Sequence, residues 1–214
     1  MKLIIDSYHE QRSRWPKEGH HILAQFDQDS VIVYQAYRPA IGHFAAEHQY
    51  FGGEFKLDRM SWIKPNFLWM MYRSGWGTKD GQEVVLAVRL TRSGFAQILA
   101  AAVHSSYARD LYSSKEAWQQ AVSTSSVRLQ WDPDHNPSGN KELRRAVQLG
   151  LRGDTIARYS KEWIVSITDI SGFVAEQRAN ARSPYQSLMT PREEVYPVRD
   201  AGVRASLGLD DWSE

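Results

Sequence analysis

The sequence predicts a single globular α+β domain over residues 1–214, built on a mixed sheet with flanking helices. A chain of 214 residues can bury one sizeable core, and its 42% hydrophobic and 24% charged residues are ordinary values for a globular protein. Runs rich in β-branched and aromatic residues alternate irregularly with helical patterns, which is typical of a mixed sheet. The sequence contains no repeat, low-complexity tract or internal linker that would divide the chain.

The N-terminal quarter is expected to contain one strand and one helix. Residues 1–25 are polar with broken periodicity, so we expect a short N-terminal arm or an initial loop. The run from Ser30 to Tyr37 is rich in β-branched and aromatic residues and predicts a strand. Arg38 and Pro39 end this strand, and Pro39 can occupy the first turn of a helix that runs to about Gln49.

The segment from Lys64 to Trp76 is compatible with either a strand or a helix. Pro65 near its start and Gly75 near its end favour a short helix. The run from Gln82 to Leu90 is the clearest strand of the chain. Its middle is apolar on both faces, which predicts a central position in the sheet, and hydroxyl side chains at its end can cap a following helix.

The C-terminal half is expected to mix short helices and strands. A strand over Ser126 to Trp131 is followed by the turn-rich run from Asp132 to Pro137. From residue 183 to residue 214 we expect an irregular tail that lies over the domain. The other expected elements are helices over about Lys115 to Val122, Lys141 to Leu149 and Asp154 to Ser160, a strand over Trp163 to Ile167, and a last helix that ends near Asn180.

The distribution of aromatic residues points to a ligand site. Eleven of the 25 aromatic residues fall between Val31 and Trp76, with Lys64 and Arg73 among them. A hydrophobic core needs large apolar residues but not these cations. Aromatic faces beside fixed cations suit a flat, anionic ligand such as a nucleotide, through stacking and phosphate pairing. The sequence therefore predicts a nucleotide-binding site in this segment.

Four blocks of the sequence resemble the signature blocks of a known family. They are VYQAY at 33–37, RMSWIKP at 59–65, FLWMMYRSGW at 67–76 and RAVQLGLRG at 145–153. The blocks resemble the domain-of-unknown-function family numbered 4291, with a likeness over residues 20–200. That family has no settled activity, so the resemblance implies no catalytic residues. The order of elements also resembles, more weakly, the ADP-ribosyltransferase superfamily, which implies a pocket for a nicotinamide dinucleotide.

Candidate ligand-binding residues come from three parts of the sequence. Open sheets place ligands at the carboxyl ends of their strands, cations among aromatic residues can bind phosphate, and basic residues at helical spacing form a further phosphate contact. The predicted ligand-binding residues are Tyr34, Gln35, Tyr37 and Arg38 at the end of the first strand, Lys64, Arg73 and Trp76 in the aromatic segment, and Arg145, Gln148 and Arg152 on one face of the expected helix.

Two residues are predicted to be catalytic. Glu83, at the start of the clearest strand, is the expected carboxylate, and Ser74 is expected to orient the ligand. Structural roles remain open alternatives for the candidates, such as an ion pair for Arg38, core packing for Trp69 and a simple helix end at Ser74.

The sequence does not favour a metal site. The chain has no cysteine, so disulfides and cysteine-ligated zinc are excluded. His43 and His48 are five residues apart on an expected helix, the wrong separation for a shared face. Asp132, Asp134 and His135 lie between prolines and are interpreted as a solvated turn. We therefore expect no required metal.

These observations favour a nucleotide-binding enzyme, with an NAD-dependent transferase resembling the ADP-ribosyltransferases as the sharpest hypothesis and NAD as its substrate. The alternative is a non-catalytic RNA- or DNA-binding module that uses the same aromatic and basic cluster. A protein-interaction domain with an aromatic patch is a third hypothesis. The expected partner is a nucleotide or nucleic acid, not a membrane. We expect a cytoplasmic location, while the oligomeric state stays open.

Overall fold

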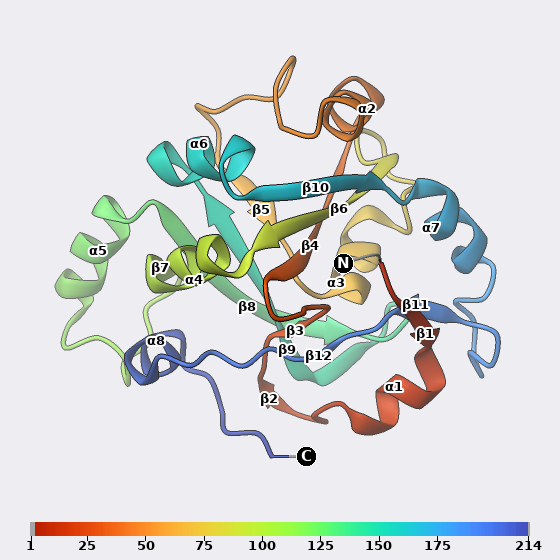
Figure 1. The fold of residues 1–214 in the computed structure, drawn as a ribbon. Coiled ribbons are helices and arrows are strands. Elements are labelled where there is room, and N and C mark those ends of the chain that lie inside the picture. The colour runs from red at the N-terminus through yellow and green to blue at the C-terminus, as the bar shows by residue number, and fades with distance from the viewer. Residues whose placement is uncertain (1–2, 214) are drawn as a thin grey trace.

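A three-stranded antiparallel sheet lies at the centre of the computed structural model, which describes residues 3–213 (Figure 1). Its strands are β4 (Ser30–Tyr37), β6 (Val84–Thr91) and β10 (Ile164–Asp169), in the order β10-β6-β4. β4 and β6 pair along their whole lengths. Because β6 has neighbours on both sides, residues 84–88 of this strand are all buried, as the apolar run predicted.

A second sheet is built on a long antiparallel ribbon of two strands, β8 (Val127–His135) and β9 (Lys141–Leu151). β7 (Ala102–His104) pairs parallel with β8, and the short β2 (Gly19–His20) pairs parallel with β9. β5 (Ser61–Ile63) pairs antiparallel with the end of β9. The order is therefore β2-β9-β8-β7, with β5 beside β9.

One backbone bridge joins the two sheets. The Tyr34 amide donates to the Lys64 carbonyl at 2.7 Å, and the Lys64 amide donates to the Tyr34 carbonyl at 3.2 Å. Lys64 directly follows β5, so the bridge connects β4 to the β5–β9–β8 layer. The two sheets together form one curled half-barrel, which confirms the predicted α+β class with its mixed sheet.

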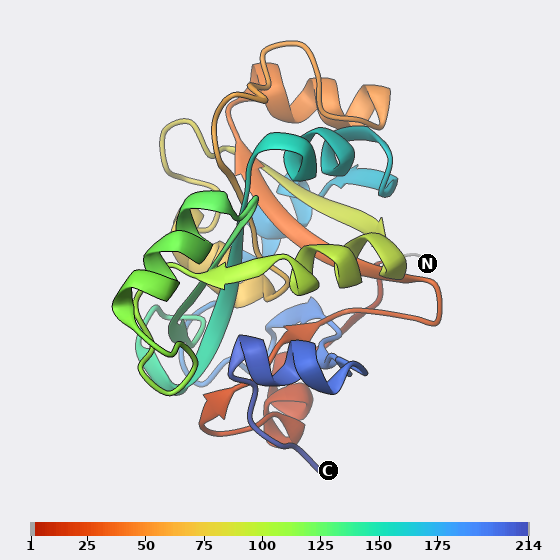
Figure 2. The same ribbon diagram turned by 90° about the vertical axis from the view of Figure 1, so that its left-hand side faces the viewer.

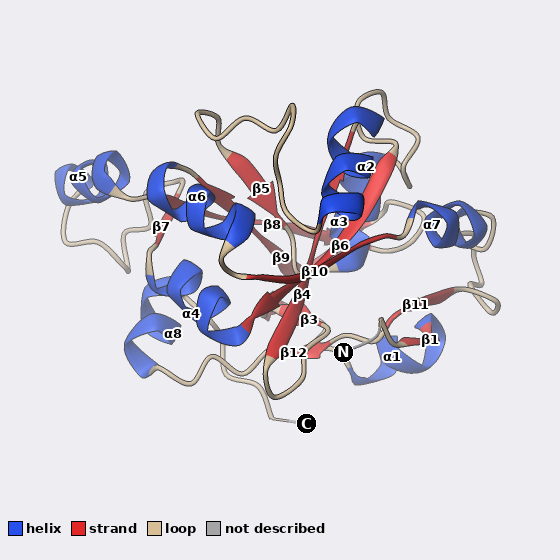
Figure 3. Cartoon of the chain, turned by 45° about the horizontal axis from the view of Figure 1, so that its top comes forward, coloured by secondary structure: helices blue, strands red, loops and turns tan. Residues whose placement is uncertain are grey.

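The half-barrel has an inner and an outer face, each with its own buried cluster. The inner cluster includes Val33, Ile63 and Leu149 from the strands. Four helices contribute to it, namely α2 (Pro39–His48), α4 (Arg92–Ala100), α6 (Gly153–Lys161) and α8 (Ala201–Leu207). The outer cluster includes Tyr34 and Val85, covered by α1 (Tyr8–Arg14), α3 (Phe67–Ser74) and α7 (Ser171–Arg178). Figure 3 shows the helices arranged around the central strands.

Both ends of the chain are more ordered than the sequence predicted. Residues 1–25, expected to form an arm or loop, contain β1 (Ile5–Ser7), α1, β2 and β3 (Leu23–Ala24). The expected irregular tail, residues 183–214, contains β11 (Met189–Pro191), β12 (Glu194–Val195) and α8. β1 pairs with β11, and β3 pairs with β12. Strands near one end of the chain are thus stabilised by strands near the other end, which the local sequence of either end does not indicate. After β11 the chain crosses the molecule to reach α8 (Figure 1).

Two local predictions were wrong. The helix expected over Lys141 to Leu149 is the strand β9, in which Val147, Leu149 and Leu151 alternate with the half-buried Gln148 and face the inner cluster. The turn expected from Asp132 is the end of β8, and the turn begins only at Asn136, whose side chain accepts from the amides of Ser138 and Asn140. In both cases the strand ladder prevailed over local preferences for helix and turn.

The other expected elements are present, with shifts of a few residues at their ends. α5 (Lys115–Thr124) lies beside β7, and Figure 2 shows it at one edge of the molecule. None of the helices in residues 3–213 is long and apolar enough to cross a membrane.

We predict that the buried ion pair between Arg144 and Asp134 is necessary for stability. The Arg144 Nε donates to the Asp134 carboxylate at 2.8 Å, and the same guanidinium donates to the Pro16 carbonyl at 2.7 Å. Arg144→Met should lower the free energy of unfolding by about 3–5 kcal/mol, because it leaves a buried carboxylate unpaired. Urea denaturation measures this loss.

The control is the exposed pair of Arg38 and Glu54. Arg38→Ala should cost less than about 1 kcal/mol. The double variant Arg144→Met/Asp134→Leu should recover part of the loss because no unpaired charge remains. A single variant as stable as the parent protein would contradict this role.

Candidate functional site

Helix α3 is fixed at both ends by specific hydrogen bonds. At its start the Asn66 side chain accepts from the Trp69 amide at 2.7 Å, and the buried Glu193 carboxyl accepts from the Phe67 amide at 2.6 Å. At its end Gly75 adopts a left-handed conformation, φ 58°, which closes the last turn. The helix is thus held in one position against the outer face of the half-barrel.

Lys64 lies between β5 and α3, and its side chain points to the outer face. Bridge partners in an antiparallel pair point to the same side of a sheet, and Tyr34 belongs to the outer cluster. Lys64 is only 6% exposed. Its Nζ atom has no hydrogen bond or ion pair with any residue of 3–213, yet it is not among the side-chain nitrogen atoms sealed from solvent.

A carboxylate lies on the same face. The strand register places Gln130 opposite Gln148, and Asp132 follows two residues after Gln130 on the same side of β8. The two oxygens of Asp132 accept from the side-chain amides of Gln130 at 2.9 Å and Gln148 at 2.7 Å. These amides hold the carboxylate in a fixed orientation.

The surroundings lower the pKa of Lys64 to about 8. Burial of the ammonium group is the largest cause, and the positive charge of Arg73 acts in the same direction. Asp132 opposes both by favouring the charged form. The neutral fraction of Lys64 near physiological pH is therefore larger than that of an ordinary surface lysine, although most of the group stays charged.

Arg73 brings a second unpaired cation to this region. It lies in the last turn of α3 and is exposed, and its guanidinium has no hydrogen bond or ion pair within residues 3–213. Two other arginines that the sequence made prominent have partners, because Arg38 pairs with Glu54 and Arg144 pairs with Asp134. Two neighbouring cations without partners are thus left on the outer face.

Aromatic rings border this pair of cations. Trp69, Tyr72 and His135 form a stacked layer, with the Tyr72 and His135 ring centroids 3.5 Å apart. Tyr72 is 42% exposed and so offers ring surface to solvent. At the other end of the face, Trp62 lies over Gly150, where a Cβ atom would come within 3.0 Å of the indole ring. Tyr72 and Trp62 provide two flat surfaces for a planar ligand.

Of the candidates on β4, Tyr34 lies beside Lys64 through the backbone bridge. Gln35 and Tyr37 are on the inner side, where Gln35 donates to Tyr37 at 2.7 Å and to Ser61 at 2.9 Å, and accepts from Tyr159 at 2.6 Å. Tyr34 is fully buried against Phe67. Gln35 and Tyr37 thus have internal hydrogen-bond partners, whereas the buried Tyr34 hydroxyl has none within residues 3–213. Arg38 lies in an exposed ion pair.

The two predicted catalytic residues have different surroundings. The hydroxyl of Ser74 is buried, donates to the Met70 carbonyl at 2.9 Å and accepts from the Gly77 amide at 3.2 Å, so it stabilises the end of α3. One oxygen of Glu83 accepts from the Gly81 amide at 2.9 Å. Its other oxygen is buried and has no hydrogen-bond partner within residues 3–213.

The remaining candidates are separated by the strand geometry of β9. Gln148 contacts Asp132 on the outer side. Arg145 is three residues away along the strand, so its side chain points to the opposite side of the sheet, and it is exposed. Arg152 donates to the Ser125 carbonyl at 2.9 Å and to the Ser123 carbonyl at 2.9 Å, which ties α6 to the end of α5.

Trp76 donates from its indole nitrogen to the Pro137 carbonyl at 3.2 Å and lines a cavity of about 340 Å³ beside Tyr72.

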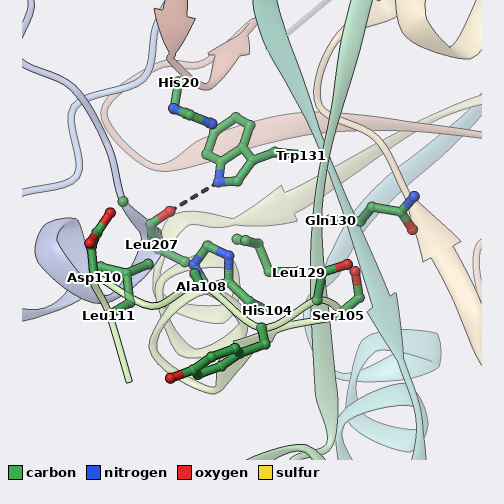
Figure 4. A pocket seen from close by; sticks show the side chains of 13 residues that line it. His20, His104, Ser105, Ala108, Asp110, Leu111, Leu129, Gln130, Trp131 and Leu207 are labelled. Carbon is green, nitrogen blue, oxygen red and sulfur yellow. Dashed lines mark hydrogen bonds between the residues drawn. The ribbon is translucent and has the colours of Figure 1, made fainter. Parts of the chain in front are cut away.

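A larger cavity of about 460 Å³ lies elsewhere, between β8, residues 104–111 and α8 (Figure 4). Two of its polar rings already have partners, because Trp131 donates to the Leu207 carbonyl at 2.9 Å and the His104 ring contacts the Ser206 carbonyl at 3.1 Å. Gln130 points away from it, across β8 (Figure 4). None of the predicted site residues lines this cavity.

Asp132 and Gln130 are the members of the outer-face site that sequence reasoning missed. Asp132 was hidden by the interpretation of residues 132–137 as a turn, and Gln130 was placed in a predicted strand without a role. Alternation along 127–132, with Val127 and Leu129 apolar, could have indicated that Arg128, Gln130 and Asp132 share one side of a strand. Within residues 3–213 no three His, Cys, Asp or Glu side chains are grouped so as to hold a metal ion.

Comparison with known proteins identifies a family but no activity. A family model described as "Domain of unknown function (DUF4291)" matches residues 21–196 of the chain. No curated protein matches the chain.

We predict that Lys64→Met raises the free energy of unfolding at pH 7, by up to about 3 kcal/mol, because burial of an unpaired ammonium disfavours the folded state. The pKa of Lys64 is about 8 when folded and is expected at about 10.5 when unfolded. Between these values the unfolded chain binds more protons, so the parent protein gains stability as pH rises. The advantage of the variant should therefore be full below pH 8 and shrink toward pH 10.5.

Chemical denaturation of the parent protein and the variant at several pH values measures this difference. Lys56→Met, at an exposed lysine, is the control and should show no such trend. If Lys64→Met were instead strongly destabilised at pH 7, the ammonium group would have a stabilising partner and the site would be structural.

Proposed function

We propose that this chain, which belongs to the DUF4291 family, binds a nucleotide on the outer face of its half-barrel and acts on it as a transferase. The observation that carries the proposal is the pair of neighbouring cations, Lys64 and Arg73, that have no partner within residues 3–213. Repulsion between like charges is unfavourable, and a bound anion removes it. A phosphate or pyrophosphate group supplies such an anion and accepts charge-assisted hydrogen bonds from both residues.

The neighbouring side chains favour a nucleotide over a simple phosphate. Tyr72 and Trp62 offer partly exposed rings at either end of the face, and a base or nicotinamide ring can stack on such surfaces. Gln130 and Gln148 provide amide groups close to the cations. On this one face the cations suit the phosphates of a nucleotide, the rings suit its base, and the amide groups suit the hydroxyl groups of its sugar.

The finer proposal is transfer from NAD through cleavage of its nicotinamide–ribose bond. This bond breaks through an electron-poor, oxocarbenium-like ribose that a nearby carboxylate stabilises. Asp132 is the carboxylate of the outer face, and its orientation is fixed by two amides. Lys64 and Arg73 would hold the pyrophosphate, so that the ribose lies beside Asp132. Glu83, the carboxylate expected from the sequence, is the alternative for this role.

We predict that Arg73→Ala weakens the binding of ADP by roughly 10- to 100-fold and leaves the fold intact, since a charge-assisted hydrogen bond contributes about 1.5–3 kcal/mol. Isothermal titration calorimetry measures the affinity. Arg38→Ala is the matched control, because Arg38 is exposed and paired with Glu54. Equal loss of affinity in both variants would show a general charge effect rather than a site at Arg73.

We also predict that the protein releases nicotinamide from NAD and that Asp132→Asn abolishes the release, whereas Glu83→Gln retains it. Chromatography of free nicotinamide, with NAD alone and with protein, RNA or DNA acceptors, measures the reaction. Loss of activity in Glu83→Gln alone would assign the carboxylate to Glu83. Absence of release with every acceptor, together with tight, salt-sensitive binding of oligonucleotides, would favour a nucleic-acid-binding module instead.

A further inference from the structure

Lys64 differs in its surroundings from an ordinary binding cation. A lysine that only attracts phosphate works best when exposed and fully charged, as Arg73 is. The stem of Lys64 is instead buried between β5 and α3, and its Nζ atom has no partner within residues 3–213, although it is not completely sealed from solvent. Burial of an amine without an ion pair is unfavourable for folding, so we expect the amine to have a role in function.

We propose that Lys64 is a nucleophile whose Nζ atom forms an imine with an aldehyde that carries a phosphate group. The inference rests on the proposed nucleotide site, because Arg73 contacts phosphate in both, whereas Lys64 changes from a phosphate contact to the attacking amine. It goes further by assigning a covalent step to Lys64 and by naming the second functional group of the ligand. The open-chain form of a ribose attached to a nucleoside diphosphate belongs to this class of ligand.

The site contains the groups that imine formation requires. The neutral amine attacks the carbonyl carbon, a C–N bond forms, and the carbonyl oxygen takes up a proton. The resulting carbinolamine then loses this oxygen as water and becomes the imine, so an amine and an aldehyde give an imine and water without any oxidant or reductant. Asp132 lies near enough to Lys64 to influence its charge and can transfer the proton from nitrogen to the departing oxygen.

Two features adjust the reactivity of Lys64. Burial and the charge of Arg73 both lower the pKa of Lys64, which increases the neutral fraction that can attack a carbonyl. The backbone of Lys64 is held by both hydrogen bonds of the bridge to Tyr34, so the start of its side chain has a fixed position. The reactive nitrogen is therefore presented beside Arg73 and Asp132 rather than on a mobile loop.

Labelling with pyridoxal 5′-phosphate, an aromatic aldehyde with a phosphate group, tests the proposal. The protein is incubated with limiting reagent at neutral pH, imines are reduced with cyanoborohydride, and modified lysines are located and counted by peptide mass spectrometry. We expect Lys64 to be labelled at least roughly tenfold faster than the exposed Lys56, because its lowered pKa increases the neutral fraction of Lys64 and Arg73 lies beside it to bind the phosphate. Labelling of Lys64 no faster than Lys56 would overturn the proposal.

Variants separate the amine from the phosphate contact. Arg73→Ala should slow labelling of Lys64 by pyridoxal 5′-phosphate about tenfold more than it slows labelling by pyridoxal, which lacks the phosphate and reports only the change in the reactivity of the amine. Lys79→Met is the matched control, because Lys79 is exposed, lies close in sequence and contacts only the Arg73 carbonyl. It should leave the labelling of Lys64 unchanged. If Arg73→Ala slowed the labelling of Lys64 by the same factor with both reagents, the assignment of the phosphate contact to Arg73 would be overturned.

The outcome is distinguishable from failure of the nucleotide proposal. ADP that binds by calorimetry and protects Lys64 from labelling would support both proposals. Rapid, phosphate-dependent labelling of Lys64 without any binding of ADP would support the nucleophile and reject the nucleotide. Binding of ADP together with slow labelling of Lys64 would reject the nucleophile and retain the nucleotide.

Discussion

The backbone bridge between Tyr34 and Lys64 is the constraint on which the rest of the site depends. It is the place where the three-stranded sheet and the β5–β9–β8 layer meet, so it converts two sheets into one curled half-barrel. The same two hydrogen bonds direct the Lys64 side chain to the outer face. A residue at this junction therefore contributes to the architecture through its backbone and is free to contribute chemistry through its side chain.

The two cations on the outer face are arranged differently from Arg144 and Arg152. The buried Arg144–Asp134 pair satisfies both partners, and Arg152 binds backbone carbonyls. Lys64 and Arg73 lack such compensation within residues 3–213, while Asp132 is restrained by amides rather than by a cation in contact with it. Proteins tolerate unfavourable electrostatics mainly where function needs them, and this local imbalance is the physical basis for locating a ligand there.

The sequence predicted the parts of this fold that depend on local pattern. The strands over residues 30–37 and 82–90 and the short helix after Pro65 are confirmed because their apolar periodicity and end residues are encoded locally. The paired ends of the chain could not be predicted, because β1 and β11 stabilise each other across the whole sequence. The strand β9 was missed because Arg145, Gln148 and Arg152 also fit helical spacing. For the site, the composition of the aromatic segment predicted that Lys64 and Arg73 belong together. The place of Asp132 beside them could not be predicted, because it depends on the register of β8 against β9.

The contact between Glu193 and the first amide of α3 has a consequence for the order of folding. It joins residues that are 126 positions apart, and the neighbouring bond from Trp15 to the Glu193 carbonyl spans 178 positions. Closing such long loops is entropically costly and slow, so contacts of this kind form late along a folding pathway. The half-barrel can assemble from nearer pairings such as β8 with β9 before the start of α3 acquires its acceptor. In kinetic terms, we expect the outer face to take its final form after the scaffold.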